Sequence, residues 1–184
     1  IIINNKKNID KYSREYHDHG HENNSKLPRG RDSRSIYGFN YRMTEMQGVV
    51  GKVQLKKLDK IIYENKKRYK RLSVLLSKKL QLREIPKKSS PIYDAFIFFV
   101  KNKNLRKKII KLLNDEKIGT KNLPDAIEWH CASYWGHAIS KSEINKIKYT
   151  KKLLKTAIAI PILLNQKTSF YHNLGFKIKK LIAR

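Results

Sequence analysis

The chain has 184 residues, which is enough for one ordinary domain or for part of a larger protein. With 40% hydrophobic residues it can form a packed core, and no apolar run approaches the roughly 20 residues of a membrane span. The single cysteine, Cys131, excludes an internal disulfide and suits the cytoplasm. The net charge of +27 is typical of a nucleic-acid-binding module, but the lysines are spread along the chain without interleaved aromatic residues, so we expect no specific nucleic-acid site.

The first residues predict a short strand followed by a helix. Residues 1–3 are apolar and indicate the end of a buried strand. Asn4 or Asn5 is a suitable N-cap for a helix that runs to about residue 17. The expected apolar face of this helix, at spacings of i, i+3 and i+7, consists of Ile9, Tyr12 and Tyr16.

Residues 19–41 are polar and contain the breakers Pro28, Gly30 and Gly38. A connection of this length is usually functional or disordered. Its charge is locally positive, carried by Lys26, Arg29, Arg31, Arg34 and Arg42. Because a guanidinium binds carboxylates and phosphates in a two-pronged geometry, we expect this loop to contact an anionic group.

Residues 37–58 form the stretch around which the chain is organised. Thr44 stands three residues before Gln47, which is the capping-box spacing of a helix start. The helix that follows has apolar residues near helical spacing, namely Met46, Val49, Val50, Val53, Leu55 and Leu58. A polar loop that runs into a helix N-terminus favours an anion. From spacing alone, an N-capped core helix and an anion site are equally consistent with this pattern.

The remaining two thirds predict alternating helices and strands. The first helix is expected to break near residue 58, with a second helix to about residue 80 and a turn-rich linker at 86–91. The expected strands are a central strand at 93–100, a short edge strand at 120–123 and a strand at 157–164. The expected helices between and after them are at 105–117, at 143–156 and from about residue 174. This alternation predicts an α/β layer rather than a helical bundle.

Two clusters have simple structural interpretations. His17, His19 and His21 alternate at the end of a helix, without a cysteine nearby, so we expect no metal site and favour a role in holding the loop. Trp129, Tyr134 and Trp135 suggest a small aromatic core.

Residues 38–59 read G-F-N-Y-R-M-T-E-M-Q-G-x-x-G-x-x-Q-L-x-K-L-D, which resembles the signature of the DegT/DnrJ-type sugar aminotransferases. The resemblance implies an α/β fold, the C-terminal half of a fold type I enzyme that uses pyridoxal 5′-phosphate (PLP). It further implies that residues 1–85 are the end of the PLP-binding large domain, and that residues 86–184 are a small C-terminal α/β domain.

Three further stretches resemble a narrower subgroup of this family. They are H-D-H-G-H-E-N-N from residue 17, L-P-R-G-R-D from residue 27 and T-K-x-L-P-x-A-x-x-W-H from residue 120. The subgroup transaminates the C8 ketone of an oxidised Kdo sugar to give 8-amino-3,8-dideoxy-manno-octulosonate for lipopolysaccharide, with glutamate as amino donor. A nucleotide-sugar aminotransferase that makes another amino sugar is the alternative within the family.

The resemblance also implies roles for individual residues. Asn40 occupies the place of an amide that reaches across a homodimer interface to the PLP phosphate, with Tyr41 and Arg42 beside it. His130 matches the family's loop histidine near the sugar. The positive charge of the loop, more than the family motif, makes Arg29 and Arg31 the expected partners of the acid group of the sugar or of glutamate. His19 and Tyr37 are further expected substrate contacts. The Schiff-base lysine is expected upstream of residue 1, so we expect this chain to hold no catalytic residue and to be inactive alone.

Overall fold

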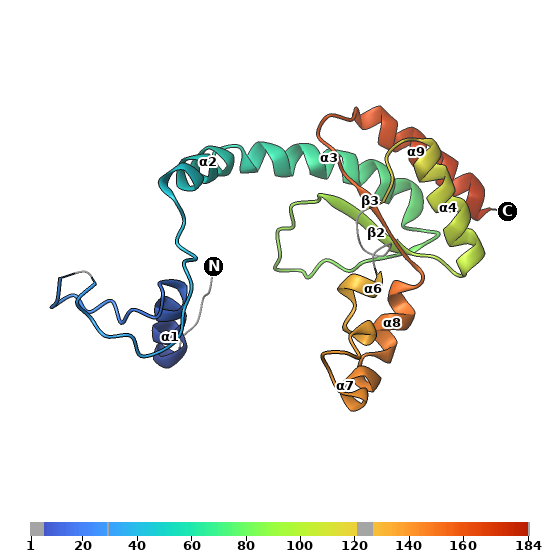
Figure 1. Ribbon diagram of the computed structural model, residues 1–184. Helices are drawn as coiled ribbons and strands as arrows, with labels where there is room; N and C mark the ends of the chain where they lie inside the picture. Colours follow the sequence, from blue (N-terminus) through green and yellow to red (C-terminus); the bar gives the residue numbers. More distant parts are fainter. Residues whose placement is uncertain (1–5, 29, 121–126, 184) are drawn as a thin grey trace. The chain divides into compact units, whose positions relative to one another are not determined.

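The computed structural model describes residues 6–28, 30–120 and 127–183 (Figure 1). The chain forms two compact units, Ile1–Lys56 and Lys57–Arg184. The division expected at residue 85 on family grounds stays a prediction. The strand predicted at residues 1–3, and residues 121–123 of the predicted edge strand, lie outside the described residues.

The first unit begins with helix α1 (Lys7–His17). Its N-cap is Lys6, whose side chain makes no capping hydrogen bond, so the predicted cap at Asn4 or Asn5 is wrong. The rings of Tyr12 and Tyr16 stack on the helix surface with centroids 6.1 Å apart. Burial on α1 instead falls on the polar residue Glu15, because the following loop folds over it.

The loop after α1 turns back on the helix end through two glycines. Gly20 has φ +81°, and a Cβ there would lie 1.9 Å from the carbonyl oxygen of Ile36. A Cβ on Gly38 would lie 2.4 Å from the nitrogen of Gly20. The backbone N–H of Phe39 donates to Tyr16 O at 2.9 Å, which closes the loop. Only glycine permits the two backbones to approach this closely.

Helix α2 (Glu45–Leu55) starts with the predicted capping box. Thr44 Oγ1 accepts from Gln47 N at 3.3 Å, and Gln47 Oε1 accepts from Thr44 N at 2.9 Å. The predicted break before the next helix is confirmed, since α2 ends at Leu55 and α3 starts at Leu58. None of the residues of α2 is buried, so the interpretation as a core helix is wrong for this chain.

The second unit is built on a three-stranded antiparallel sheet of order β1-β2-β3. The strands are β1 (Gln81–Leu82), β2 (Ala95–Phe99) and β3 (Ala157–Pro161). The predicted central strand is therefore confirmed as β2. Phe96 lies opposite Ile160, and Phe98 lies opposite Ile158. The turn-rich residues 86–91 lie in the connection between β1 and β2.

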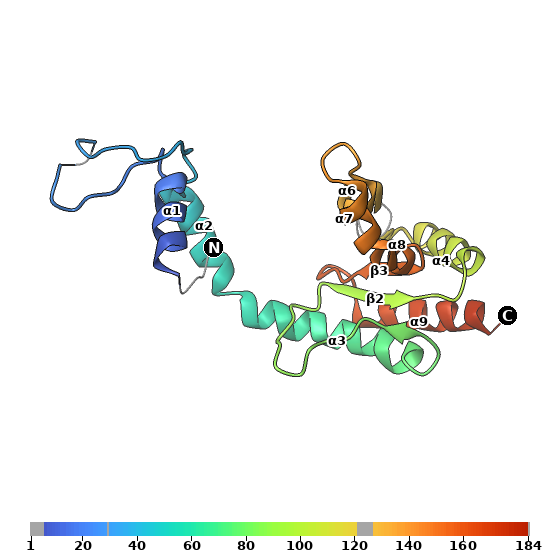
Figure 2. The same ribbon diagram turned by 90° about the horizontal axis from the view of Figure 1, so that it is seen from below.

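Helices α3 (Leu58–Leu76) and α9 (Thr168–Ile182) lie side by side in both views (Figures 1 and 2), and α4 (Lys103–Asp115) contacts α9 and β3. The short helices α6 (Ile127–His130), α7 (Lys141–Lys146) and α8 (Lys148–Leu154) lie in the connection between α4 and β3. The core under α3, α4 and α9 contains Leu72, Leu76, Phe96, Phe98, Ile109, Leu113, Ile158, Ile160, Tyr171, Leu174 and Ile178. Burial of these side chains is the main stabilising contribution.

Several predicted boundaries are wrong. Helix α9 begins at Thr168 rather than near residue 174, because the buried Tyr171 hydroxyl anchors its first turn by donating to Pro161 O at 3.2 Å. Helix α3 ends at Leu76 rather than near residue 80, and β3 ends at Pro161 rather than at residue 164. The single helix expected at 143–156 is two helices that meet at Ile147, which has non-helical φ and ψ angles.

The aromatic core predicted around Trp129 does not form. The Trp129 side chain is 82% exposed, and Trp135 uses its indole N–H to donate to Trp129 O at 3.1 Å. The short 3₁₀ helix η1 (Ala132–Tyr134) instead buries Ser133, whose hydroxyl lies 3.0 Å from Cys131 Sγ. Among the described residues, no helix has the length and apolar composition to cross a membrane.

Candidate functional site

Asn40, Tyr41 and Arg42 run antiparallel to the end of α1. Asn40 pairs with Asp18 in an isolated β-bridge, and Tyr41 N donates to His17 O at 3.0 Å. The Tyr41 ring packs against Tyr16, with centroids 6.1 Å apart. These backbone and ring contacts hold the segment just before the N-terminus of α2.

Arg42 is oriented by two oxygen atoms. Its Nε lies 3.2 Å from Asn40 Oδ1 and 3.3 Å from Asp18 Oδ1. The two Nη atoms of Arg42 have no hydrogen-bond partner within the described residues, and the Nδ2 atom of Asn40 has none there either. The segment therefore presents a guanidinium edge and an amide N–H₂ group, both donors, to whatever lies next to it. Such an arrangement fits a phosphate or carboxylate.

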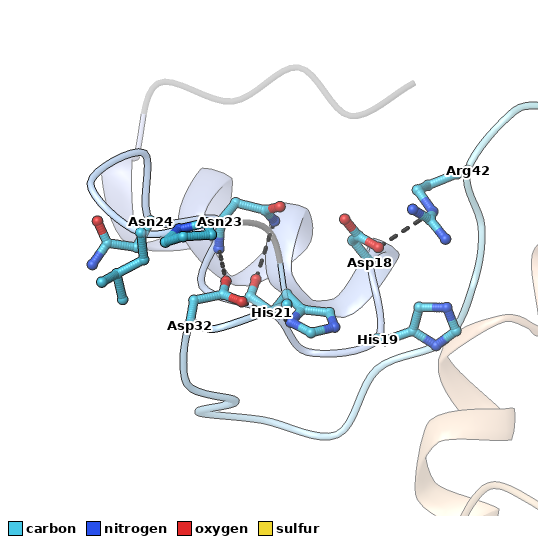
Figure 3. Close-up of a pocket in the computed structure, with 10 residues that line it drawn as sticks. Asp18, His19, His21, Asn23, Asn24, Asp32 and Arg42 are labelled. Carbon is cyan, nitrogen blue, oxygen red and sulfur yellow. Dashed lines mark hydrogen bonds and ion pairs between the residues drawn. The ribbon is translucent and has the colours of Figure 1, made fainter.

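A pocket of ≈460 Å³ adjoins Arg42 (Figure 3). It is lined by Asp18, His19, His21, Asn23, Asn24, Leu27, Pro28, Gly30, Asp32 and Arg42. All of these residues belong to the first unit and come from the loop between α1 and α2. The sequence-predicted residues that the pocket brings together are His19 and Arg42.

Asp32 holds the far part of this loop. Its Oδ1 lies 3.0 Å from His21 Nδ1, and its Oδ2 accepts from Asn23 N at 2.7 Å. Partial burial raises the pKa of the Asp32 carboxyl, but hydrogen bonds from His21 and from backbone N–H groups outweigh it and lower the pKa below its ordinary value. The predicted role of these histidines in holding the loop is therefore confirmed for His21.

Glu15 anchors the near part of the loop to α1. Ser35 Oγ donates to Glu15 Oε2 at 2.7 Å, and Gly20 N donates to Glu15 O at 2.7 Å. The second carboxylate oxygen, Oε1, is buried and lies 3.6 Å from Lys11 Nζ. The loop is thus tied to α1 by side-chain and backbone contacts.

The other predicted substrate residues lie outside the pocket lining. Arg31 and Tyr37 are exposed in the same loop, and His130 is exposed in α6 of the second unit. Arg29 lies outside the described residues. No group of three or more His, Cys, Asp or Glu side chains in the described ranges is placed to hold a metal ion.

Sequence reasoning missed Asp18, Asn23 and Asp32 as parts of the site. The signal was present, because all three lie in the H-D-H-G-H-E-N-N and L-P-R-G-R-D stretches. Their roles depend on contacts across the loop, such as that between His21 and Asp32, which spacing along the chain does not reveal.

Residues 1–170 match the DegT/DnrJ/EryC1/StrS aminotransferase family, so the chain belongs to this family. Among curated proteins, it is 30% identical over 105 residues to the lipopolysaccharide biosynthesis protein RfbH of Salmonella typhimurium, a match that covers 53% of this chain and 24% of RfbH.

Solved structures of aminotransferases share the fold. The chain is similar to Helicobacter pylori PseC, an aminotransferase of pseudoaminic acid biosynthesis, with a TM-score of 0.67 and 16% identity over 97% of this chain and 47% of PseC. It is similar to S. venezuelae DesV, solved with a ketimine intermediate, with a TM-score of 0.71 and 16% identity over 99% of this chain and 46% of DesV. An aminotransferase from Psychrobacter cryohalolentis gives a TM-score of 0.68 and 21% identity over 97% of this chain and 50% of that chain.

The chain thus spans about half the length of these solved relatives. The prediction that it has the α/β fold of part of a fold type I PLP aminotransferase is confirmed. The upstream position of the Schiff-base lysine stays a prediction.

Proposed function

We propose that the segment from Asn40 to Arg42 binds the phosphate of PLP in a sugar aminotransferase. The observation that carries this proposal is the orientation of Arg42 by Asn40 Oδ1 and Asp18 Oδ1, which leaves the Nη donors of Arg42 and the amide N–H₂ of Asn40 without a hydrogen-bond partner among the described residues. Tyr41 supports the segment through its ring contacts. The N-terminus of α2 adds a favourable potential for an anion.

Bound PLP supplies an electron sink for the carbanion that forms when the Cα proton of the amino donor leaves. The role of this chain is to bind and orient the coenzyme. Arg42 and Asn40 hold the anionic end of the coenzyme, and the capping box at Thr44 fixes the direction of the helix behind them.

The proposed reaction is transamination of a keto sugar with glutamate as amino donor. More narrowly, we propose the 8-oxo form of Kdo as acceptor, with 8-amino-3,8-dideoxy-manno-octulosonate as product. The support is the resemblance in the loop motifs and the similarity to a lipopolysaccharide biosynthesis protein. A nucleotide sugar as acceptor is compatible with the same family and is the alternative.

The acid groups of such substrates need cations and hydrogen-bond donors. His19 lies in the pocket beside Arg42, so we propose that it contacts the sugar. Arg29, Arg31, Tyr37 and His130 are proposed to contact the sugar or glutamate. We propose a homodimer in which Asn40 serves the coenzyme site of the other subunit, and no specific nucleic-acid partner.

The activity test uses the native protein purified from its source cell, since this chain alone is expected to be inactive. Formation of 2-oxoglutarate from glutamate is measured with oxidised Kdo and with a panel of nucleotide keto sugars. Turnover of oxidised Kdo alone supports the narrower proposal, and turnover of nucleotide sugars supports the alternative. A native protein that releases no 2-oxoglutarate with any keto sugar contradicts the proposed function.

A further inference from the structure

A pocket of ≈320 Å³ lies between α3 and α9 in the second unit. Its lining on α3 consists of Lys67, Lys70, Arg71, Val74 and Leu75, and its lining on α9 consists of Thr168 and His172. None of these residues is acidic. Pockets of about 300 Å³ and above are large enough for a small organic ligand. The proposed role in coenzyme binding uses no residue of this α3–α9 pocket.

Two contacts beside the pocket hold α9 on α3, and the two helices lie side by side in both views (Figures 1 and 2). Arg68 of α3 donates to Leu164 O at 3.0 Å and to Gln166 O at 2.9 Å, just before α9 begins. A Cβ on Gly175 of α9 would lie 2.7 Å from Leu75 Cδ1, so the helices are closely packed there. Because the fold fixes both walls, a ligand does not have to order them.

The α3 side of the pocket concentrates positive charge. Lys70 and Arg71 are exposed and have no ion-pair partner among the described residues, whereas Lys67 lies 3.4 Å from Glu64. An ammonium group and a guanidinium group at adjacent positions therefore point their donors to solvent beside the pocket. Groups of this kind bind phosphate through charge-assisted hydrogen bonds.

The start of α9 adds hydrogen-bond donors on the other side. Its N-cap is Lys167, whose side chain makes no capping hydrogen bond, and its first turn contains no acidic residue. Within the part of the chain that the structure describes, the backbone N–H groups of Thr168 and Ser169 have no partner. A cation at the N-cap is unfavourable for the helix itself. Sequences depart from such local rules chiefly at functional sites, and an anion bound here reverses the penalty.

Apolar surface adjoins these donors. Val74 is 77% exposed, and Leu75 lies next to it in the lining. The His172 ring packs edge-on against Phe176, with centroids 4.8 Å apart, which fixes the orientation of the imidazole. A bare inorganic ion leaves this surface in water, whereas a ligand with an apolar or aromatic group covers it.

We propose that the α3–α9 pocket binds a soluble phosphate ester of a small aromatic or apolar group. Lys70, Arg71 and the N–H groups at the start of α9 bind the phosphate, and Val74 and His172 contact the organic group. The net charge of +27 attracts anions to the whole chain, and the pocket adds donors from two helices that converge on one phosphate. This inference goes beyond the proposed function, because the second unit alone forms the pocket.

The test is a titration of the full chain with phenyl phosphate, followed by amide chemical shifts in nuclear magnetic resonance. The amides of Thr168, Ser169 and His172 should shift and saturate. Inorganic phosphate and phenol each carry only one half of the ligand, so each should bind about tenfold more weakly or worse. Lys70→Gln/Arg71→Gln should raise the dissociation constant of phenyl phosphate about tenfold or more.

A second variant removes one backbone donor without removing the helix. Thr168 is the first residue of α9, a position that tolerates proline, and the preceding Lys167 has the extended ψ of 149° that proline requires. Thr168→Pro should therefore keep α9 folded and still weaken the binding of phenyl phosphate several-fold. Equal affinity in Thr168→Pro and wild type overturns the role given to the start of α9.

The matched control removes the same charge elsewhere. Lys107→Gln/Lys108→Gln, at exposed positions of α4, should leave the dissociation constant unchanged. An equal loss in this control, or shifts spread over the whole chain, would assign the binding to net charge alone and overturn the proposal. So would the absence of a saturable shift at Thr168.

A membrane surface presents the same phosphate chemistry, so phosphatidylglycerol vesicles form a separate arm. Vesicle binding that depends on Lys70 and Arg71, without binding of phenyl phosphate, would overturn the proposal in favour of a lipid headgroup. The amides of Asn40 and Arg42 report on the coenzyme segment in the same titration. Failure at α9 and failure at that segment are therefore read separately.

Discussion

The Nε atom of Arg42 lies 3.3 Å from Asp18 Oδ1, and the two side chains are 37% and 14% exposed. Asp18 is the C-cap of α1 and Arg42 precedes α2, so this ion pair joins the two ends of the loop that forms the pocket. Because the pair occupies only the Nε edge, the guanidinium is held in place without losing its two terminal nitrogens.

This geometry predicts that charge alone is not sufficient at position 42. Arg42→Lys keeps the positive charge but lacks the planar fork, so the affinity for PLP should fall about tenfold or more. Isothermal titration measures this change. Arg14→Lys, an exposed substitution on α1, is the matched control and should have no effect. Equal affinities for wild type and Arg42→Lys would exclude a two-pronged contact.

The loop should open as the pH falls. The pKa of Asp32 is lower in the folded loop than in the unfolded chain, so its contribution to stability is present above its unfolded pKa of about 3.9 and is lost as pH falls through the folded value. Amide hydrogen exchange of Asn23, whose N–H donates to Asp32, should therefore accelerate below about pH 4. In Asp32→Asn the same amide should exchange fast at neutral pH. A slow, pH-independent opening of the Asn23 amide in both proteins would contradict this assignment.

The close approach of the loop backbone predicts a large penalty at one glycine. A Cβ on Gly38 would lie 2.4 Å from Gly20 N and 2.7 Å from Tyr16 O, so Gly38→Ala should destabilise the closed loop by about 1–3 kcal/mol. The measurement is hydrogen-exchange protection of the Phe39 amide. Gly51→Ala, in open space on α2, should instead stabilise its helix by up to about 1 kcal/mol. A Gly38→Ala protein with full protection at Phe39 would show that the loop is open in solution.

Arg68 joins helix α3 to the connection between β3 and α9. The guanidinium is nearly buried and donates from Nε to Gln166 O at 2.9 Å and from Nη2 to Leu164 O at 3.0 Å. Arg68→Lys should lower the free energy of unfolding of the second unit by about 2–3 kcal/mol, because one amine cannot reach both carbonyls. Arg71→Lys, exposed on the same helix, should change it by less than about 0.5 kcal/mol. Denaturant unfolding distinguishes the two, and equal midpoints would rule out this role of Arg68.

The sequence predicted those features that depend on neighbours along the chain. The capping box at Thr44 needs only two side chains three residues apart, and the central strand around Phe96–Phe98 is a continuous β-prone run. The predicted start of α9 was wrong because the true start depends on the hydrogen bonds of Tyr171 to the end of β3. The periodicity of apolar residues does not reveal such contacts.

The candidate site was predictable only in part for the same reason. Arg42 stands out as a cation before a helix start, but its orientation depends on Asp18, at the other end of the loop. The resemblance to the aminotransferase family implied roles for Asn40 and Arg42. It did not indicate that Asp32 would hold the pocket wall through His21.

The central claim is that Asn40 and its neighbours bind the phosphate of the coenzyme. It is tested most directly by comparing the affinities for PLP and for pyridoxal, which lacks the phosphate, in wild type, Asn40→Ala and the exposed control Asn104→Ala. Wild type and the control should prefer PLP by about tenfold or more, and Asn40→Ala should lose most of that preference. Equal affinity of wild type for the two compounds, or a preference that survives in Asn40→Ala, would contradict the account.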